Sequence, residues 1–215
     1  MDINSTEEQQ VEAIKKFWQE NGTNILLGAA LGLGGFASWN WYVDKQISDK
    51  EAASAQYEDF VNVASATDVS LDSVSEELAK FTAAHGESGY SIFVQLVAAK
   101  QAVTEGNFEL AEKSLTQALT QTDSDSLAAL IKVRQARVQM ELEKYDAALS
   151  ALSSIANSAF DAKAAELKGD IYLAQGNADK ARVEYQAAAD KGGLEGNNLL
   201  QMKLDDLTVS TQVNG

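Results

Sequence analysis

Several residue types that support common protein chemistries are missing or scarce in this chain of 215 residues. There is no cysteine, which excludes disulfide bonds, thiolate metal sites and a lipidated N-terminal cysteine. There is no proline either, as expected for a chain made almost wholly of uninterrupted helices. The single histidine, His85, lies in the stretch AAHGESGY, which is more typical of a loop than of a catalytic base.

Motifs for catalysis, metal binding and nucleotide binding are missing as well. The run Gly86-Glu87-Ser88-Gly89 contains a serine, but it lacks the GxSxG spacing that exposes a nucleophile between a strand and a helix. No HExxH, EF-hand or GK[ST] phosphate-loop pattern occurs. We therefore predict that the protein is not an enzyme and that it uses no cofactor and no metal.

Positive charge is scarce. The 17 lysines and arginines stand against 32 aspartates and glutamates, which gives a formal net charge of −15. Such a surface repels phosphate backbones, so nucleic acid is excluded as a partner. The mean hydropathy of −0.22 is that of a polar chain, with room for one domain of roughly 170 residues beside a single apolar segment.

One stretch, ILLGAALGLGGFASWNWYV at residues 25–43, carries no charge at all. As a helix it would be roughly 29 Å long, which matches the ~30 Å hydrocarbon core of a bilayer. Trp39, Trp41 and Tyr42 cluster at its end, as amphipathic rings do at a membrane interface. A buried glycine-rich helix is the alternative, but each glycine would weaken it in water by up to about 1 kcal/mol. We predict a single transmembrane helix over residues 25–43.

We expect this segment to be an uncleaved signal anchor. The first twenty residues are mostly acidic where a signal peptide is basic, and the triplet Ala53-Ser54-Ala55 lies too far past the apolar region to be a cleavage site. Charge does not orient the span, because two lysines closely precede it and two closely follow it.

A face of small residues, Gly28, Gly32 and Gly35, runs along the predicted span. The GxxxG spacing of the first two lets a second helix approach closely in lipid. These glycines are therefore candidate residues for helix packing in the membrane, and a generic glycine-rich anchor is the alternative.

Residues 1–24 form a separate segment before the span. Val11, Ile14 and Phe17 share one face of a predicted helix, which Gly22 is well placed to end. Such an amphipathic helix either docks on a membrane protein or lies on the bilayer surface.

Residues 44–208 are predicted to form one helical domain, followed by a flexible tail at 209–215. A long helix over residues 45–66 continues directly from the anchor, and a second helix ends near His85.

Three stretches of this domain repeat one pattern of turn, small residue and helix. They are EGNFELAEKSLTQAL at 105–119, LEKYDAALSALSSI at 142–155 and QGNADKARVEYQAA at 175–188, with Glu143 at the turn position of the second. Their spacing matches the tetratricopeptide repeat of about 34 residues, although the terminal proline of that repeat is missing. The residues that define the repeat are Ala99, Gly106, Ala111, Ala136, Ala148, Gly169, Gly176 and Ala181.

The predicted fold class is therefore all-α, with an N-terminal single transmembrane helix followed by a tetratricopeptide-repeat-like (TPR-like) α-solenoid. Stacked helix pairs leave an extended concave surface, which here has the mixed apolar and basic character that suits an extended or unfolded peptide. Ordinary interhelical packing is the alternative role for most of its candidate residues. By the usual register of the repeat these candidates are Phe93, Leu96, Lys100, Leu130, Val133, Arg137 and Met140.

The whole arrangement resembles one protein family. A short acidic tail, the stretch QVEAIKKFWQENG, a glycine-rich span ending in WNWY and a degenerate repeat domain follow one another as in the YfgM family of Gram-negative inner-membrane proteins. The resemblance implies a single-pass protein of the bacterial inner membrane, with a cytoplasmic N-terminus and a periplasmic repeat domain. It also implies partnership with the SecYEG translocon and with a periplasmic chaperone of the PpiD type, acting on unfolded secreted proteins. A membrane-anchored scaffold for another envelope complex is the alternative that the residues leave open.

Overall fold

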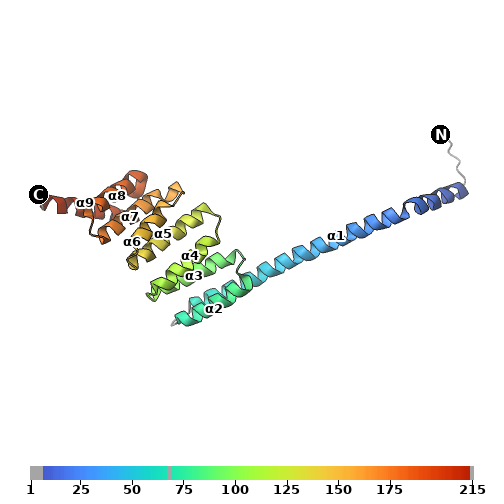
Figure 1. Cartoon of the computed structure of the whole chain (residues 1–215), viewed down its shortest axis with the longest axis horizontal. Helices are drawn as coiled ribbons and strands as arrows, with labels where there is room; N and C mark the ends of the chain where they lie inside the picture. The colour runs from blue at the N-terminus through green and yellow to red at the C-terminus, as the bar shows by residue number, and fades with distance from the viewer. Residues whose placement is uncertain (1–6, 67–68, 214–215) are drawn as a thin grey trace. The chain divides into compact units, whose positions relative to one another are not determined.

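The computed structural model describes residues 7–66 and 69–213 (Figure 1). Within these ranges every regular element is a helix, so the prediction of an all-α fold is confirmed. The chain divides into two compact units, Met1–Ala52 and Ala53–Gly215. Residues 1–6 of the predicted N-terminal segment and 214–215 of the predicted tail lie outside the described residues.

The first unit holds the N-terminal part of a single helix, α1 (Glu7–Ala64). The prediction that Gly22 ends this helix is wrong, because α1 continues through it. Gly22 is buried beside the Trp18 side chain, whose Cε3 atom lies 3.0 Å from the place that a Cβ of residue 22 would occupy. One glycine costs a helix only about 1 kcal/mol relative to alanine, which the helix-forming residues on both sides outweigh.

The prediction of a membrane span is not confirmed. In residues 7–66 and 69–213, no helix combines the length and the apolar character needed to cross a bilayer. Large apolar side chains between residues 25 and 42 of α1 are exposed, from 41% for Ile25 to 71% for Leu33.

The second unit begins with residues 53–64 of α1 and continues as a series of short helices. Helices α2 to α9 pack in chain order, each mainly against the helices before and after it, as Figure 1 shows from green to red. The series runs through α2 (Leu71–His85), α3 (Tyr90–Thr104), α4 (Phe108–Thr120), α5 (Asp125–Glu141), α6 (Tyr145–Ser153), η1 (Ser158–Phe160), α7 (Asp161–Ala174), α8 (Ala178–Ala188), η2 (Ala189–Gly193) and α9 (Asn198–Val213).

The helix pairs α3–α4, α5–α6 and α7–α8 are the three predicted repeats. A short turn joins each pair, and its central residue has a left-handed backbone: Gly106 at φ 72°, Glu143 at φ 56° and Gly176 at φ 75°. Glycine adopts this conformation freely, whereas a residue with a Cβ pays about 1 kcal/mol or more. Among the described residues, Glu143 is the only non-glycine residue with a positive φ. The turn therefore keeps its shape in the second repeat although glycine is missing.

The residue after the turn also differs between the repeats. The Asn107 side chain accepts a hydrogen bond from the Leu110 backbone N–H at 3.0 Å, and the Asn177 side chain accepts one from Lys180 at 3.1 Å. Such caps satisfy one of the free N–H groups at a helix start. Lys144 takes this position in the second repeat and makes no side-chain cap, so the second turn is the least supported by local interactions.

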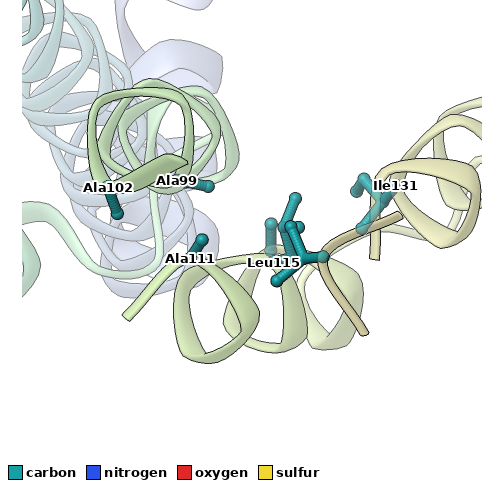
Figure 2. Packing of buried hydrophobic residues seen from close by; sticks show 7 residues of the cluster. Ala99, Ala102, Ala111, Leu115 and Ile131 are labelled. Carbon is teal, nitrogen blue, oxygen red and sulfur yellow. The ribbon is translucent and has the colours of Figure 1, made fainter. Parts of the chain in front are cut away.

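Small residues let the two helices of a pair approach closely. In the first pair, Ala99 and Ala102 of α3 face Ala111 of α4, and all three are buried (Figure 2). Leu115 of α4 lies on the side towards Ile131 of α5, so the same apolar cluster continues into the next pair. The first pair is thereby joined to the second by buried apolar contacts.

The third pair achieves the close approach with a glycine. A Cβ on Gly169 of α7 would overlap the ring of Tyr185 of α8, which is fully buried. At the equivalent positions the other two pairs combine an alanine with a leucine, Leu115 or Leu152. The larger aromatic side chain is thus accommodated by the smaller partner. The repeat-defining residues lie as follows: Ala99, Ala111, Ala136, Ala148, Gly169 and Ala181 are buried, and Gly106 and Gly176 form turns.

In the described part of the second unit, most buried apolar residues lie in four successive clusters, each shared by neighbouring helices. Each helix pair is therefore stabilised chiefly by the pairs beside it, as in a solenoid. The largest fully buried side chains of these clusters are Phe60, Phe81, Ile131, Leu152, Ile171, Tyr185 and Leu200.

Candidate binding groove

A groove of about 890 Å³ opens between α3, α4 and α5. Helices α3 and α5 supply most of its lining, α4 contributes Phe108 and Leu115, and Tyr57 comes from the last turns of α1. All these residues belong to the second unit. The volume lies in the range of about 300–1,000 Å³ that is usual for binding clefts.

Two stripes of side chains at helical spacing form the walls of this groove. On α3 the stripe runs from Phe93 through Lys100 to Thr104, and on α5 it runs from Leu127 to Glu141. At 1.5 Å per residue the stripes are about 17 Å and 21 Å long. An extended chain advances about 3.3 Å per residue, so a segment of five or six residues would span the groove.

Apolar side chains in the groove remain accessible to solvent. Phe93 is 46% exposed and Val103 is 42% exposed. The Tyr57 ring meets the Phe93 ring edge-on, with 6.5 Å between the ring centroids. A contiguous exposed apolar surface of this kind is typical of a binding site.

The charge in the groove is opposite to that of the whole chain. Lys100, Arg134 and Arg137 bring three positive charges, against the single carboxylate of Glu141, whereas the chain has a net charge of −15. None of the three cations belongs to an ion pair within the part of the chain that the structure describes. The groove is therefore a positively charged, partly apolar surface.

The structure brings together most of the residues predicted to line the concave surface. Five of the seven line the groove: Phe93, Leu96, Lys100, Leu130 and Arg137.

Val133 and Met140 lie elsewhere. Val133 is buried, and Met140 packs against the same cluster, which α5 shares with α6 and α7. Both residues therefore occupy the interhelical packing positions that were the alternative to the concave surface. Which of the seven contact a partner stays a prediction.

Several further residues line the groove that the repeat register did not indicate, among them Tyr57, Val103, Phe108 and Arg134. Val103 and Arg134 lie three residues from the predicted Lys100 and Arg137 on the same helices, so helical spacing could have found them. Tyr57 comes from a helix outside the repeats, and no repeat pattern indicates it.

The glycines proposed for membrane helix packing lie within α1 in the first unit. Apart from the neighbouring backbone of α1 itself, a Cβ added to Gly28, Gly32 or Gly35 would meet no atom within 4 Å. The face that they form is open in the described chain, and its packing role stays a prediction.

A second polar arrangement joins α9 to α7. Glu166 is 4% exposed and accepts hydrogen bonds from Lys163 at 2.8 Å and Lys203 at 3.0 Å. Lys203 Nζ also lies 2.6 Å from Asp170 Oδ1, which accepts the Tyr185 hydroxyl at 2.7 Å. Burial alone would raise the pKa of Glu166, but the hydrogen bonds from the two lysines outweigh it and hold that pKa below its ordinary value. This cluster, which we call the α9 lock, consists of paired charges that hold the last helix in place.

The residues considered for catalysis are not arranged for it. His85 ends α2 with its ring 5.6 Å from that of Phe81. The Ser88 hydroxyl oxygen is buried and has no hydrogen-bond partner in the described chain, so His85 does not activate it. Among the described residues, no group of three acidic, histidine or cysteine side chains could hold a metal ion.

Stacked helix pairs, left-handed turns and a groove lined by the first helices of adjacent pairs together define a helical-repeat domain of the tetratricopeptide type. A family model described as a tetratricopeptide repeat-like domain matches residues 15–209. No solved structure matches the chain.

Named relatives extend the match to almost the full chain. A Haemophilus influenzae protein named "Ancillary SecYEG translocon subunit" is 32% identical over 203 residues, covering 94% of this chain and 97% of that protein. Proteins of the same name from Escherichia coli and Neisseria gonorrhoeae are 32% and 29% identical, covering 97% and 94% of this chain and 100% and 97% of their own length. The chain therefore belongs to the family of TPR-like ancillary SecYEG translocon subunits, which confirms the resemblance predicted from its sequence.

Proposed function

We propose that this protein is an ancillary subunit of the SecYEG translocon in the bacterial inner membrane, and that it acts by binding rather than by catalysis. The observation that carries the proposal is the identity to proteins of that name over nearly their full length. Because the matched region includes both units of the chain, a shared role is supported for the whole protein and not only for a common repeat fold.

In this proposal residues 25–43 attach the protein to the membrane, with residues 1–24 in the cytoplasm and 44–208 in the periplasm. The support is the exposure of apolar and aromatic side chains, such as Leu31 at 69% and Trp41 at 66%. Leaving such surface in water costs about 25 cal/mol per Å², which burial in lipid removes. Gly28, Gly32 and Gly35 then contact a helix of the translocon or of its partner.

The groove of the second unit receives unfolded segments of newly secreted proteins, in cooperation with a periplasmic chaperone of the PpiD type. The support is its exposed apolar lining and a length that suits an extended chain of five or six residues. Binding there needs neither nucleotide nor covalent chemistry.

Photo-crosslinking in cells tests the partners directly. Probes replace Phe93 in the groove and Gly32 in α1, and a matched control probe replaces Val183, which is 65% exposed outside the groove. We expect translocon or chaperone adducts from Gly32 and adducts to secreted proteins from Phe93 but not from Val183. Adducts only to an unrelated envelope complex would replace this function with that of a scaffold.

Topology is tested with single cysteines, because the natural chain has none. Gln9→Cys and Ser153→Cys place one thiol in each unit at exposed positions. A maleimide that crosses only the outer membrane should label residue 153 in intact cells and label residue 9 only after lysis. Equal labelling of both in intact cells would contradict the proposed anchor.

A further inference from the structure

We infer that the groove selects apolar polypeptide segments that carry aspartate or glutamate over equally apolar segments that carry lysine or arginine. The inference rests on the proposed function, since it assigns a substrate class to the groove that this function uses. It is carried by the sign and the position of the charges that line the groove.

The unpaired state of the groove cations is the first observation. Some lysines elsewhere in the described part of the second unit pair with carboxylates, whereas Lys113 and Lys180 at exposed positions do not. Lys144 lies 2.5 Å from Glu112, and Lys203 lies 3.0 Å from Glu166. The groove cations Lys100, Arg134 and Arg137 make no such pair within the described residues, although acidic residues greatly outnumber basic ones in this chain. The groove thus offers positive charge that the protein itself does not neutralise.

The position of the cations is the second observation. Lys100 follows Ala99, and Arg137 follows the equivalent Ala136, so the two cations occupy the same repeat position on opposite walls. Arg134 lies one turn from Arg137 on α5. A bound segment would therefore meet positive charge from both sides along the middle of its length.

Apolar side chains flank these charges and define the rest of the substrate. Phe93 and Leu96 precede Lys100 on α3, Val103 follows it, and Leu130 precedes Arg134 on α5. A segment that fits has apolar side chains for these surfaces and one or two carboxylates near its centre. A lysine at the same place would face three positive charges against the single carboxylate of Glu141, which is unfavourable.

The size of the preference follows from the exposure of the charges. Partly exposed ion pairs are each worth only a few tenths of a kcal/mol to about 1 kcal/mol, so several of them correspond to about tenfold in affinity. Salt screens such pairs because the Debye length falls to about 3 Å at 1 M ionic strength. The preference is therefore expected at low salt and largely lost at about 1 M.

Fluorescence anisotropy with defined peptides tests the inference. The full chain is placed in nanodiscs of zwitterionic lipid, and empty nanodiscs serve as the blank. The probes are labelled peptides of about ten residues in which leucine and phenylalanine alternate with aspartate, with asparagine or with lysine. We expect the aspartate peptide to bind about tenfold more tightly than the lysine peptide at low salt, with the asparagine peptide between them.

Charge reversal provides the matched comparison. In Lys100→Glu/Arg137→Glu the order of the three peptides should invert. The control Lys113→Glu/Lys180→Glu changes the net charge equally at exposed residues outside the groove and should keep the original order.

The outcomes separate the inference from the proposed function. Equal binding of all three peptides by the natural chain would overturn the charge preference while leaving polypeptide binding in place. If the control double variant also inverts the order of the peptides, the preference comes from the net charge of the protein and not from the groove. That result would also overturn the inference. No binding of any peptide would contradict both the inference and the proposed use of the groove.

Discussion

The first and third helix pairs share one register but use the same positions in opposite ways. Lys100 lines the open groove, and its equivalent in the third pair is Asp170, which pairs with Lys203 of α9. Leu96 also lines the groove, and its equivalent is Glu166, buried in the α9 lock. The inner face of the solenoid is thus open at α3, where it is apolar and basic. It is covered at α7, where acidic residues pair with a lysine of α9.

The second pair lies between these two cases. Arg137 lines the groove like its equivalent Lys100, whereas Val133 is buried against the following helices. Helix α5 therefore lines the groove with one face and packs against α6 and α7 with another. At the end of the solenoid, the terminal helix α9 covers the apolar face of the third pair, which would otherwise be exposed to water.

One added methyl group should disrupt the close approach of α7 and α8. Of the substitutions that we propose, it should lower the free energy of unfolding most. Gly169→Ala should lower the free energy of unfolding by about 3 kcal/mol, because the new Cβ overlaps the buried Tyr185 ring. Urea unfolding of the detergent-solubilised full chain measures the loss.

A second substitution sharpens this comparison between the pairs. Gly169→Ala with Tyr185→Leu recreates the alanine–leucine combination of the other two pairs. The double variant should lose less stability than the sum of its single variants, by about 1 kcal/mol. Simple additivity would mean that the two side chains do not compete for the same space.

Removing the lysine of the α9 lock should have the next largest effect. Lys203→Met leaves Glu166 and Asp170 with one partner fewer, and we expect a loss of about 2 kcal/mol because these groups are only partly exposed. Lys113→Met, at an exposed position, should change the free energy of unfolding by less than about 0.5 kcal/mol. Equal losses in the two variants would show that the lock contributes nothing specific.

The left-handed turns of the repeats offer a substitution that should stabilise the protein. Glu143→Gly should raise the free energy of unfolding by about 1 kcal/mol, since it removes a Cβ from a left-handed backbone. Gly176→Ala places a Cβ at the equivalent turn and should lower it by a similar amount. Thermal unfolding monitored by circular dichroism reads both changes, and effects of the same sign would contradict the shared turn geometry.

The smallest effect that we expect concerns pH. The folded-state pKa of Glu166 lies below its ordinary value of 4.5, so its contribution to stability is present above that value and is lost as the pH falls through the folded-state pKa. Glu166→Gln takes up no proton there, so its stability deficit should be largest near neutral pH and should shrink in acid. Urea unfolding at about pH 7 and about pH 3 measures the two deficits, and a constant deficit would contradict the pKa assignment.

Local patterns predicted much of the repeat domain. The recurrence of Ala111, Ala148 and Ala181 set the register, and the positions of Gly106 and Gly176 placed the turns. These features depend on residues close together in the chain, where spacing alone decides which side chains share a helix face.

Contacts between distant residues were harder to predict. Gly22 resembles a helix end, but Trp18 and the following residues keep α1 continuous. Tyr57 joins the groove from outside the repeats, and Met140 leaves the predicted concave surface for the interior side of α5. Single-helix periodicity does not indicate which of two apolar faces a neighbouring helix covers.

The sequence by itself determined that the protein is helical, acidic and built from repeats with a mixed apolar and basic inner face, because composition and spacing are local properties. Only the tertiary structure decided where that face is open. Within the described chain it leaves Lys100 and Arg137 without an ion pair in a groove, and it pairs Glu166 and Asp170 with Lys203 of α9. The reason is that burial and ion pairing depend on which helices pack together, and α9 reaches α7 from more than thirty residues away along the chain.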